Sequence, residues 1–474
     1  MGLKYDLVVI GGGSGGLSAA AGAARFGAKV ALVEKHKLGG ECLWTGCVPS
    51  KALMKSAKVA HLINTAHLFG LEKHRSSLKF EKVIAHVQAV IDAVKSQDSP
   101  ERFKGLGVDV FFGSPSFKDK HTLVVKDQEL TAKKFIVATG SRPFKLPVSG
   151  LEEAGYLTNE TLFANKVLPK KLLVIGGGPI GVEMAQAFAR LGAQVIVFER
   201  GDQLLGKEDP EVVQVIERVF EKEGIVVLKN VEFVNVEKKG KKKVIHIVQK
   251  GKKNADEGDE ILLAVGRSPN VEGLNLEGIG VKYDKRAISV NDRLQTSVPN
   301  IYAIGDVKGK FLFTHIAGYE ASVALANALF KIPVKADYRV IPWTTFTDPE
   351  VARVGFTEQE LKEKRMKYEV LRFPFKEVDR AQTDVETEGF FKVLTDLKGK
   401  ILGVHIVGAN AGELLPEFVL AMKKKLKVTD IFRTIHVYPT LGTANQLVAG
   451  KFYEKKLTER VKRLLQAVFG FGSK

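Results

Sequence analysis

Two stretches of the chain share one order of apolar, small and polar positions. The first spans residues 5–35 and the second residues 172–200. In each, a short apolar run meets a glycine-rich segment, a longer alanine-containing segment follows, and a second apolar run ends on a glutamate. Short apolar runs bounded by glycine predict buried strands, and the longer segment between them predicts a helix. Each stretch is therefore predicted to form a strand–turn–helix–strand unit of an α/β protein.

The predicted turns both carry the spacing G-x-G-x-x-G, which is typical of a Rossmann-like dinucleotide-binding unit. The first glycine permits a tight turn, the second lets a pyrophosphate approach the backbone, and the third lets helix and strand pack closely. The helix N-terminus then offers free N–H groups to the phosphates. The glycines are Gly11, Gly13 and Gly16 in the first unit and Gly176, Gly178 and Gly181 in the second.

The glutamates that close the two units are candidates for binding a ribose. Glu34 is placed to accept hydrogen bonds from the ribose hydroxyls of the first dinucleotide. Glu199 holds the same place in the second unit and would repel the 2′-phosphate of NADPH, so NADH is expected to be preferred. Arg200 follows directly and weakens that preference. Two such sites in one chain predict electron transfer between a flavin and a nicotinamide.

Cysteine usage adds a candidate redox centre. The 474-residue chain has only two cysteines, Cys42 and Cys47, and both lie in the segment GGECLWTGCVPSK. Two cysteines cannot form a disulfide framework, so we expect a redox-active pair rather than a structural bridge. A helix N-terminus and a nearby lysine would favour the thiolate form of such a pair.

Charge and hydropathy exclude several other classes of protein. The formal net charge is +18, but much of the excess lies in one lysine-rich segment, residues 238–253, which is expected to be a solvated hairpin. Zinc-finger spacing and RNA-binding aromatic motifs are missing, so no nucleic-acid partner is expected. The sequence contains no apolar run of about 18 residues and no signal peptide at its start, which predicts a cytoplasmic protein.

With both glycine motifs and the cysteine pair, the sequence resembles the class I pyridine nucleotide-disulfide oxidoreductases. This family includes lipoamide dehydrogenase, glutathione reductase and mercuric reductase. Further matching segments are ATGSRP (138–143), VGRSPN (265–270), TSVPNIYAIGD (296–306) and FTDPEVARVGF (346–356). The resemblance implies a homodimer whose subunits have a split FAD domain, an NAD(P) domain and a C-terminal α+β dimerisation domain. The expected bounds are 1–147 with 270–338 for FAD, 148–269 for NAD(P), 339–455 for dimerisation and 456–474 for a basic tail.

The resemblance also implies roles for individual residues and no bound metal ion. Cys47 would contact the flavin as a charge-transfer thiolate, Cys42 would exchange electrons with the substrate, and Lys51 would lie near the flavin and pair with Glu183. The FAD-binding residues would be Gly11, Gly13, Gly16, Glu34, Lys51, Thr139, Gly140 and Asp306, the last at the ribityl chain. The NAD(P)H-binding residues would be Gly176, Gly178, Ile180, Gly181, Glu183, Glu199, Arg200 and Gly266.

The C-terminal half departs from the pattern of the disulfide-reducing members. These enzymes carry a histidine before a proline and a glutamate five residues later, which together move a proton to the exchanging thiol. Here Tyr438 and Thr443 hold those positions. His436 lies two residues earlier without an acid at the family position, so we expect it to be a packing or interface residue. A tyrosine with a pKa of about 10 is a poor proton shuttle at neutral pH.

Two features leave the electron acceptor open. Mercuric reductase also has a tyrosine at this place, yet it uses a C-terminal cysteine pair, and this chain has no cysteine after Cys47. Glu41 and Trp44 replace residues that are usually Thr and Asn, and Trp44 either lines the flavin site or fills a gap in the core. The leading hypothesis is a mercuric-reductase-like enzyme with a small-molecule or protein-bound acceptor. The alternatives are a disulfide reductase such as dihydrolipoamide dehydrogenase, and a membrane-associated reductase of a quinone or carrier protein.

The basic tail has apolar residues at helical spacing. From residue 451 onward it carries seven basic and two acidic residues, a net charge of +5. Such a helix either packs on its own dimer, which is the preferred interpretation, or contacts an anionic membrane or a partner. The apolar positions are Leu457, Val461, Leu464, Leu465 and Val468.

Overall fold

The structure is a computed structural model that describes residues 3–470. In it, a seven-stranded sheet carries the first glycine turn. Its strand order is β3-β2-β1-β6-β5-β4, with β16 added on β6. The strands β1, β2, β3, β6 and β16 are parallel, and helices connect β1 to β2 and β2 to β3. The strands are β1 (Leu3–Ile10), β2 (Val30–Glu34), β3 (Val108–Phe112), β4 (Pro115–Asp119), β5 (Thr122–Val125), β6 (Gln128–Val137) and β16 (Ile301–Ala303).

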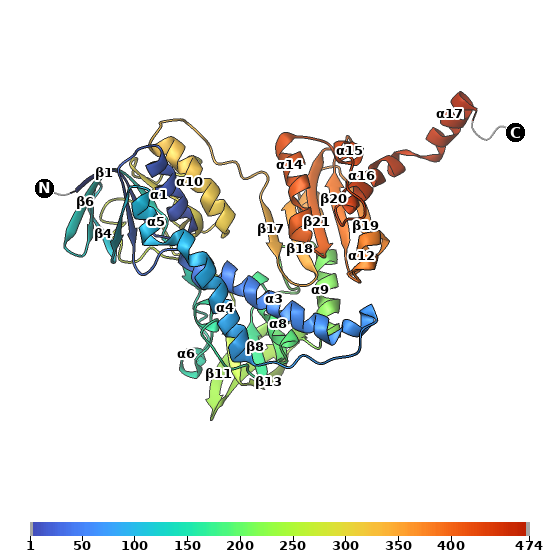
Figure 1. The fold of residues 1–474 in the computed structure, drawn as a ribbon, viewed down its shortest axis with the longest axis horizontal. Coiled ribbons are helices and arrows are strands. Elements are labelled where there is room, and N and C mark those ends of the chain that lie inside the picture. The colour runs from blue at the N-terminus through green and yellow to red at the C-terminus, as the bar shows by residue number, and fades with distance from the viewer. Residues whose placement is uncertain (1–2, 471–474) are drawn as a thin grey trace.

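This sheet is completed by a segment far along the chain. Strand β16 pairs with β6, and the helix that follows it, α10 (Thr314–Ala328), packs beside α1 (Ser14–Arg25) (Figure 1). The first unit is therefore discontinuous, as the split FAD domain requires. The remaining helices before β6 are α2 (Gly40–Trp44), α3 (Cys47–Asn64), α4 (Phe80–Val94) and α5 (Pro100–Gly105), with short 3-10 turns at Ala66–Phe69 and Lys95–Asp98.

A second, four-stranded parallel sheet carries the second glycine turn. Its order is β10-β9-β8-β14. A three-stranded antiparallel sheet, β11-β12-β13, lies between β10 and β14 in the chain. Together these two sheets form the second part of the molecule, whose strands are β8 (Lys171–Ile175), β9 (Gln194–Phe198), β10 (Val226–Leu228), β11 (Val231–Lys239), β12 (Lys242–Gln249), β13 (Lys252–Gly258) and β14 (Glu260–Leu263). Its helices are α6 (Leu151–Ala154), α7 (Asn159–Leu162), α8 (Pro179–Arg190) and α9 (Pro210–Lys222).

The lysine-rich segment differs from the expected single solvated hairpin. It forms two consecutive hairpins in the β11-β12-β13 sheet, and some of its lysines are ion-paired. Lys243 is buried against Glu260 because the strand alternation turns its side chain inward.

A five-stranded antiparallel sheet, β17-β18-β21-β20-β19, forms the C-terminal part. Helices on this sheet bury a separate apolar core (Figure 1). The strands are β17 (Pro342–Thr345), β18 (Glu350–Gly355), β19 (Glu369–Pro374), β20 (Phe390–Thr395) and β21 (Ile401–Gly408). The helices are α11 (Glu358–Glu363), α12 (Asp379–Thr383), α13 (Ala411–Leu414), α14 (Pro416–Lys424), α15 (Val428–Arg433) and α16 (Thr443–Lys456).

Two short strands join the first two parts of the molecule. β7 (Ser141–Pro143) and β15 (Arg267–Pro269) form an antiparallel pair where the chain enters and leaves the second part. The expected domain bounds of 147 and 270 fall just after these strands. These bounds remain predictions.

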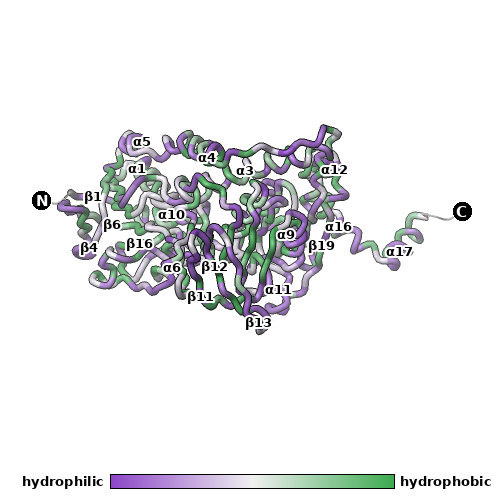
Figure 2. The backbone as a smooth tube through the Cα atoms, turned by 90° about the horizontal axis from the view of Figure 1, so that it is seen from below, coloured by the Kyte–Doolittle hydropathy of each residue, from purple (hydrophilic) through white to green (hydrophobic). Residues whose placement is uncertain are grey.

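The last described helix, α17 (Glu459–Phe469), points away from the rest of the molecule (Figure 1). None of its residues is buried, and hydrophilic and hydrophobic segments alternate along it (Figure 2). The predicted tail is thus helical over these residues, while residues 471–474 lie outside the described part. Among residues 3–470, no helix combines the length and apolarity that crossing a membrane requires.

Candidate functional site

The first glycine turn forms a cradle that side chains would fill. Gly11 has a positive φ of 105°, and a Cβ there would overlap the carbonyl oxygen of Ala138, the residue after β6. A Cβ on Gly16 would overlap the Gly11 carbonyl, so α1 packs against β1 only with glycine at this place. At Gly13 the nearest atom to a Cβ position is the Gly40 Cα, at 3.8 Å, which leaves the N-terminus of α1 open. This opening fits a pyrophosphate.

The second turn repeats this geometry. Gly176 has a φ of 109° and faces the Ala264 carbonyl, and Gly181 faces the Gly176 carbonyl. No atom lies within 4 Å of a Cβ position on Gly178, so the N-terminus of α8 is open as well. The structure therefore contains two equivalent cradles that fit two dinucleotides.

The glutamates at the strand ends are held in the same way in both units. Glu34 accepts a hydrogen bond of 2.7 Å from the Gly12 N–H, and Glu199 accepts one of 2.7 Å from the Gly177 N–H. Their second oxygens accept bonds from the backbone two residues further on, at 2.8 and 2.6 Å. Each carboxylate oxygen keeps a free lone pair, which fits a ribose diol. Arg200 is exposed beside Glu199.

The two cysteines lie on consecutive short elements close to the first cradle. Cys42 is in α2, and Cys47 is the first residue of α3. Both are free thiols, with Cys47 exposed and Cys42 partly buried. A hydrogen bond between the two sulfur atoms lowers the pKa of Cys47 to about 6 and raises the pKa of Cys42. The Thr314 hydroxyl, 3.5 Å from the Cys47 sulfur, and the Lys51 ammonium lower the Cys47 pKa further.

Lys51 lies one turn after Cys47 on α3 and contacts the second unit. Its Nζ is 2.8 Å from Oε2 of Glu183, which is buried on α8. The other oxygen of Glu183 accepts a 2.9 Å hydrogen bond from the Phe346 N–H, and the Lys51 ammonium lies 4.3 Å from the Phe346 ring centre. Packing of α3 along α8 brings these residues together (Figure 1). Ile180, one turn before Glu183, is exposed.

The remaining predicted cofactor residues lie at the junction of the two nucleotide units. Thr139 and Asn270 bond to each other reciprocally, at 2.6 and 3.0 Å, and the Asn270 N–H donates to the Gly140 carbonyl. Gly266, with a φ of 125°, precedes β15. These contacts hold the two crossover strands together beside the first cradle.

A polar network beside the cysteines was missed by sequence reasoning. The predicted ribityl-binding residue Asp306 accepts a 2.6 Å hydrogen bond from Ser141 and lies 3.8 Å from Arg267. Arg267 also forms an ion pair with Glu41, the residue before Cys42. Asn159 donates a 2.9 Å hydrogen bond to Glu41. The motif VGRSPN contains Arg267, but sequence alone did not indicate its partner.

Trp44 is held by the loop after β2. Its indole N–H donates a 2.7 Å hydrogen bond to the Leu38 carbonyl, and the Lys37 ammonium lies 3.6 Å from a ring centre. The partly buried ring also packs on the apolar core around α3. These contacts favour the packing alternative for Trp44.

Tyr438 is displayed on the surface of the C-terminal part. Its side chain is 68% exposed and its hydroxyl donates a 2.8 Å hydrogen bond to Asp379, which raises the pKa of Tyr438. Apolar side chains on α14, α15 and α16 and in the segments between these helices are exposed too, as expected of a dimer interface. They are Leu420, Leu426, Phe432, Ile435, Val437 and Leu447.

The expectation that His436 lacks an orienting acid is wrong. Its Nε2 lies 3.1 Å from both carboxylate oxygens of Glu417, which Asn445 also contacts at 2.8 Å. Its Nδ1 lies 2.9 Å from the Thr434 carbonyl. Both ring nitrogens therefore face acceptors, which holds the ring in place and leaves neither nitrogen free to serve a substrate. The acid was missed because Glu417 is on α14, 19 residues away in the chain.

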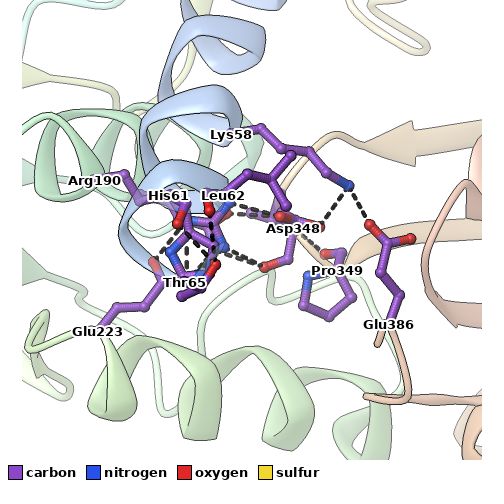
Figure 3. A network of polar contacts seen from close by, with 11 residues as sticks. Lys58, His61, Leu62, Thr65, Arg190, Glu223, Asp348, Pro349 and Glu386 are labelled. Atoms are coloured by element: carbon purple, nitrogen blue, oxygen red, sulfur yellow. Dashed lines mark hydrogen bonds and ion pairs between the residues drawn. The ribbon is translucent and has the colours of Figure 1, made fainter. Parts of the chain in front are cut away.

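A charged network joins all three parts of the molecule behind Lys51 (Figure 3). Arg190 on α8 pairs with Asp348 and Glu223, each at 2.6 Å. Lys58 on α3 reaches Asp348 at 3.3 Å and Glu386 at 2.8 Å. An adjoining cavity of about 230 Å³ is lined by residues of α3, α8 and the segment 346–350. The network fixes α3 between the nucleotide units and the C-terminal sheet.

Comparisons with known proteins match this architecture. Residues 5–321 match the family model described as pyridine nucleotide-disulphide oxidoreductase, and residues 341–448 match its dimerisation domain. A mercuric reductase of Lysinibacillus sphaericus is 37% identical over 451 residues, which cover 95% of this chain and 83% of the relative. A dihydrolipoyl dehydrogenase of Thermus scotoductus is 39% identical over 442 residues, which cover 92% and 95%.

Solved structures show the same fold. The Cu(II) complex of the HOCl-induced flavoprotein disulfide reductase RclA from Escherichia coli superposes with a TM-score of 0.85 and 25% sequence identity. The match covers 94% of this chain and 99% of that chain.

Proposed function

The chain belongs to the pyridine nucleotide-disulphide oxidoreductase family, and we propose that Cys42 and Cys47 are its redox-active pair. It is an enzyme that uses FAD and NAD(P)H, and its dimerisation domain supports a homodimer. The observation that carries the proposal is the position of Cys47, at the start of α3, with Cys42 on one side and Lys51 one turn further. This arrangement stabilises a thiolate.

We assign the first cradle to FAD and the second to NAD(P)H. Gly11, Gly13 and Glu34 would hold the FAD diphosphate and ribose, and Gly178 and Glu199 would hold those of the nicotinamide cofactor. Bound FAD supplies two-electron transfer between NAD(P)H and the cysteines. The backbone-anchored carboxylate of Glu199 favours NADH, because a 2′-phosphate would meet it directly.

The protein's own residues manage charge at the cysteines. When the Cys42–Cys47 bond is reduced, two electrons and one proton, both from the hydride of NAD(P)H, convert it to a Cys42 thiol and a Cys47 thiolate. Lys51 offsets the negative charge on Cys47, and Glu183 holds Lys51 in position. Cys42 then delivers the electrons to the acceptor.

We propose a metal ion of soft or redox-active character as the acceptor. In the dimerisation domain, the Tyr438 hydroxyl donates a hydrogen bond to Asp379. His436, two residues earlier in the sequence, has an acceptor at each of its ring nitrogens. Reduction of a disulfide substrate needs a proton shuttle, whereas reduction of a metal ion does not. The mercuric reductase relatives and the Cu(II) complex of RclA support this class of acceptor.

Steady-state turnover tests the acceptor. Purified enzyme with NADH is compared on Hg(II), Cu(II), lipoamide and glutathione disulfide, with the C42S variant as control. We expect metal-dependent NADH oxidation that disappears in C42S, and turnover of both disulfides at least about 100-fold lower, the usual contribution of a general acid–base group. Efficient lipoamide turnover would instead assign a dihydrolipoamide dehydrogenase.

We also propose that α17 docks on an anionic membrane surface. Its apolar residues Val461, Leu464 and Val468 are exposed, and Arg460, Lys462 and Arg463 lie among them. A helix with one apolar and one basic face binds at the headgroup region of anionic bilayers. Such docking would place the enzyme at the membrane periphery.

A further inference from the structure

We propose that Glu41 is a positioning residue that lowers the redox potential of the Cys42–Cys47 pair. The inference rests on the proposed redox role of these cysteines. It concerns the residue that immediately precedes Cys42 and whose side chain contacts residues of α7 and β15.

The Glu41 side chain is fixed by two donors from outside the first nucleotide unit. Asn159, a buried residue at the start of α7, donates to one carboxylate oxygen at 2.9 Å, and Arg267 of β15 pairs with the other. The same Asn159 amide donates to the Thr45 carbonyl at 3.2 Å, so the carboxylate is tied to the turn between the cysteines. The Glu41 Cγ lies only 3.4 Å from a Cβ position on Gly46, the residue before Cys47.

Arg267 is itself held in place and cannot turn toward Cys47. Its Nε donates to the Ser141 hydroxyl at 2.7 Å. Its Nη2, the nitrogen that also pairs with Glu41, donates to the Ser141 carbonyl at 2.9 Å. Asp306 lies 3.8 Å from the same guanidinium. Two carboxylates, Glu41 and Asp306, thus share one cation, and the group carries a net negative charge.

This negative group opposes the charge that reduction creates. Burial is the main cause that raises the pKa of Glu41 to about 7; Arg267 lowers that pKa, and the charges of Asp306 and Cys47 raise it further. The repulsion acts in both directions, so a carboxylate at residue 41 disfavours the reduced, thiolate-bearing state. A pair with a lower potential is a stronger reductant toward its acceptor. The usual threonine at this position carries no charge and would lack this effect.

The test is the equilibrium between the cysteine pair and an NADH/NAD⁺ buffer in the FAD-loaded enzyme, at a fixed pH above the Glu41 pKa of about 7 so that the carboxylate is ionised. We expect E41Q to favour the reduced pair about tenfold more than the wild type, which equals about 30 mV for two electrons. E41D keeps the charge and should stay within about twofold of the wild type. E153Q is the matched control, because Glu153 is an exposed carboxylate on α6.

A second variant changes the sign of the effect. R267M removes the cation and leaves both carboxylates uncompensated, so the equilibrium should move toward the disulfide, and flavin absorbance reports whether the variant retains FAD. An unchanged equilibrium in E41Q, or an equal shift in E41D and E41Q, would overturn the inference. Failure of the proposed function gives a different result, because no reducible cysteine pair would then be detected in the wild type.

Discussion

At the scale of single residues, charge decides what the cysteine pair can do. Cys47 lies at a helix start, receives a hydrogen bond from Cys42 and has Lys51 one turn away. By the inference above, the negative charge of Glu41 acts in the opposite direction, and its ion pair with Arg267 offsets that charge in part. Tyr438 stands at the position where disulfide-reducing relatives are expected to carry the proton-shuttling histidine, and its hydroxyl donates a hydrogen bond to Asp379. The site is thus prepared for electron delivery more than for proton delivery.

The Cys47 thiolate should be present at neutral pH and disappear in mild acid. Its pKa is depressed to about 6, so the thiolate dominates above that pH and is lost as pH falls through it. The long-wavelength thiolate–flavin band of the NADH-reduced enzyme should titrate accordingly. C42A, which removes the principal hydrogen-bond donor and is measured without NADH because it has no disulfide to reduce, should move the midpoint upward. A midpoint near 8 to 9 in the wild type, the range of a free cysteine, would contradict the proposed stabilisation.

Restoring the family base should create disulfide reductase activity. In the double variant Y438H/T443E, histidine and glutamate stand at the positions that disulfide-reducing relatives use. We expect lipoamide turnover to rise at least about tenfold, since a placed general base contributes 10²–10⁴-fold in favourable cases. The single variant T443E, which lacks the histidine, is the control. If lipoamide turnover does not rise in a correctly folded double variant, the missing base is not what limits this reaction.

At the scale of elements, helices place the chemistry and one helix remains outside the body. Helix α3 begins at Cys47, packs along α8 and brings Lys51 to Glu183. Helix α17 has no buried residue and exposes both apolar and basic side chains. The preferred expectation that this tail packs on its own dimer is not tested by a single subunit.

Membrane docking by α17 should depend on both faces of the helix. The full-length enzyme should float with vesicles containing about 30% phosphatidylserine, an anionic composition chosen after the expected electrostatics, and not with pure phosphatidylcholine. L464D/V468D should abolish flotation by disrupting the apolar face. L71D/V167D is the matched control, because Leu71 and Val167 are exposed apolar residues outside α17. Equal flotation of the wild type and L464D/V468D would assign the helix to protein contacts instead.

At the scale of the whole molecule, the two nucleotide units and the C-terminal part are joined at α3. Arg190 on α8 forms ion pairs with Asp348 in the C-terminal part and with Glu223, the residue after α9 (Figure 3). Lys58 on α3 also pairs with Asp348. The network fixes the direction in which the C-terminal sheet faces the nucleotide units. It thereby sets where the dimerisation surface with Tyr438 is presented.

Breaking the centre of this network should destabilise the junction strongly. The Arg190 side chain is only 6% exposed, so R190M leaves two carboxylates without their buried partner, and the loss should be about 3 kcal/mol or more. K58M removes two pairs whose side chains are about one-quarter exposed and should cost about 1 kcal/mol or less for each pair. Thermal unfolding of the two variants provides the comparison. Equal midpoints would show that Arg190 does not hold the junction.

The sequence by itself determined the two dinucleotide units, the cysteine pair and the family, and the family matches confirm the predicted α/β class and resemblance. These features follow from local spacing, since glycine turns, strand-end glutamates and a Cys-x₄-Cys segment act over a few residues. Only the tertiary structure placed Glu417 beside His436, Arg267 beside Glu41 and Asp348 beside Arg190. Such pairs join residues 19 to 226 positions apart, and no local pattern encodes them because the packing of separate sheets brings them together.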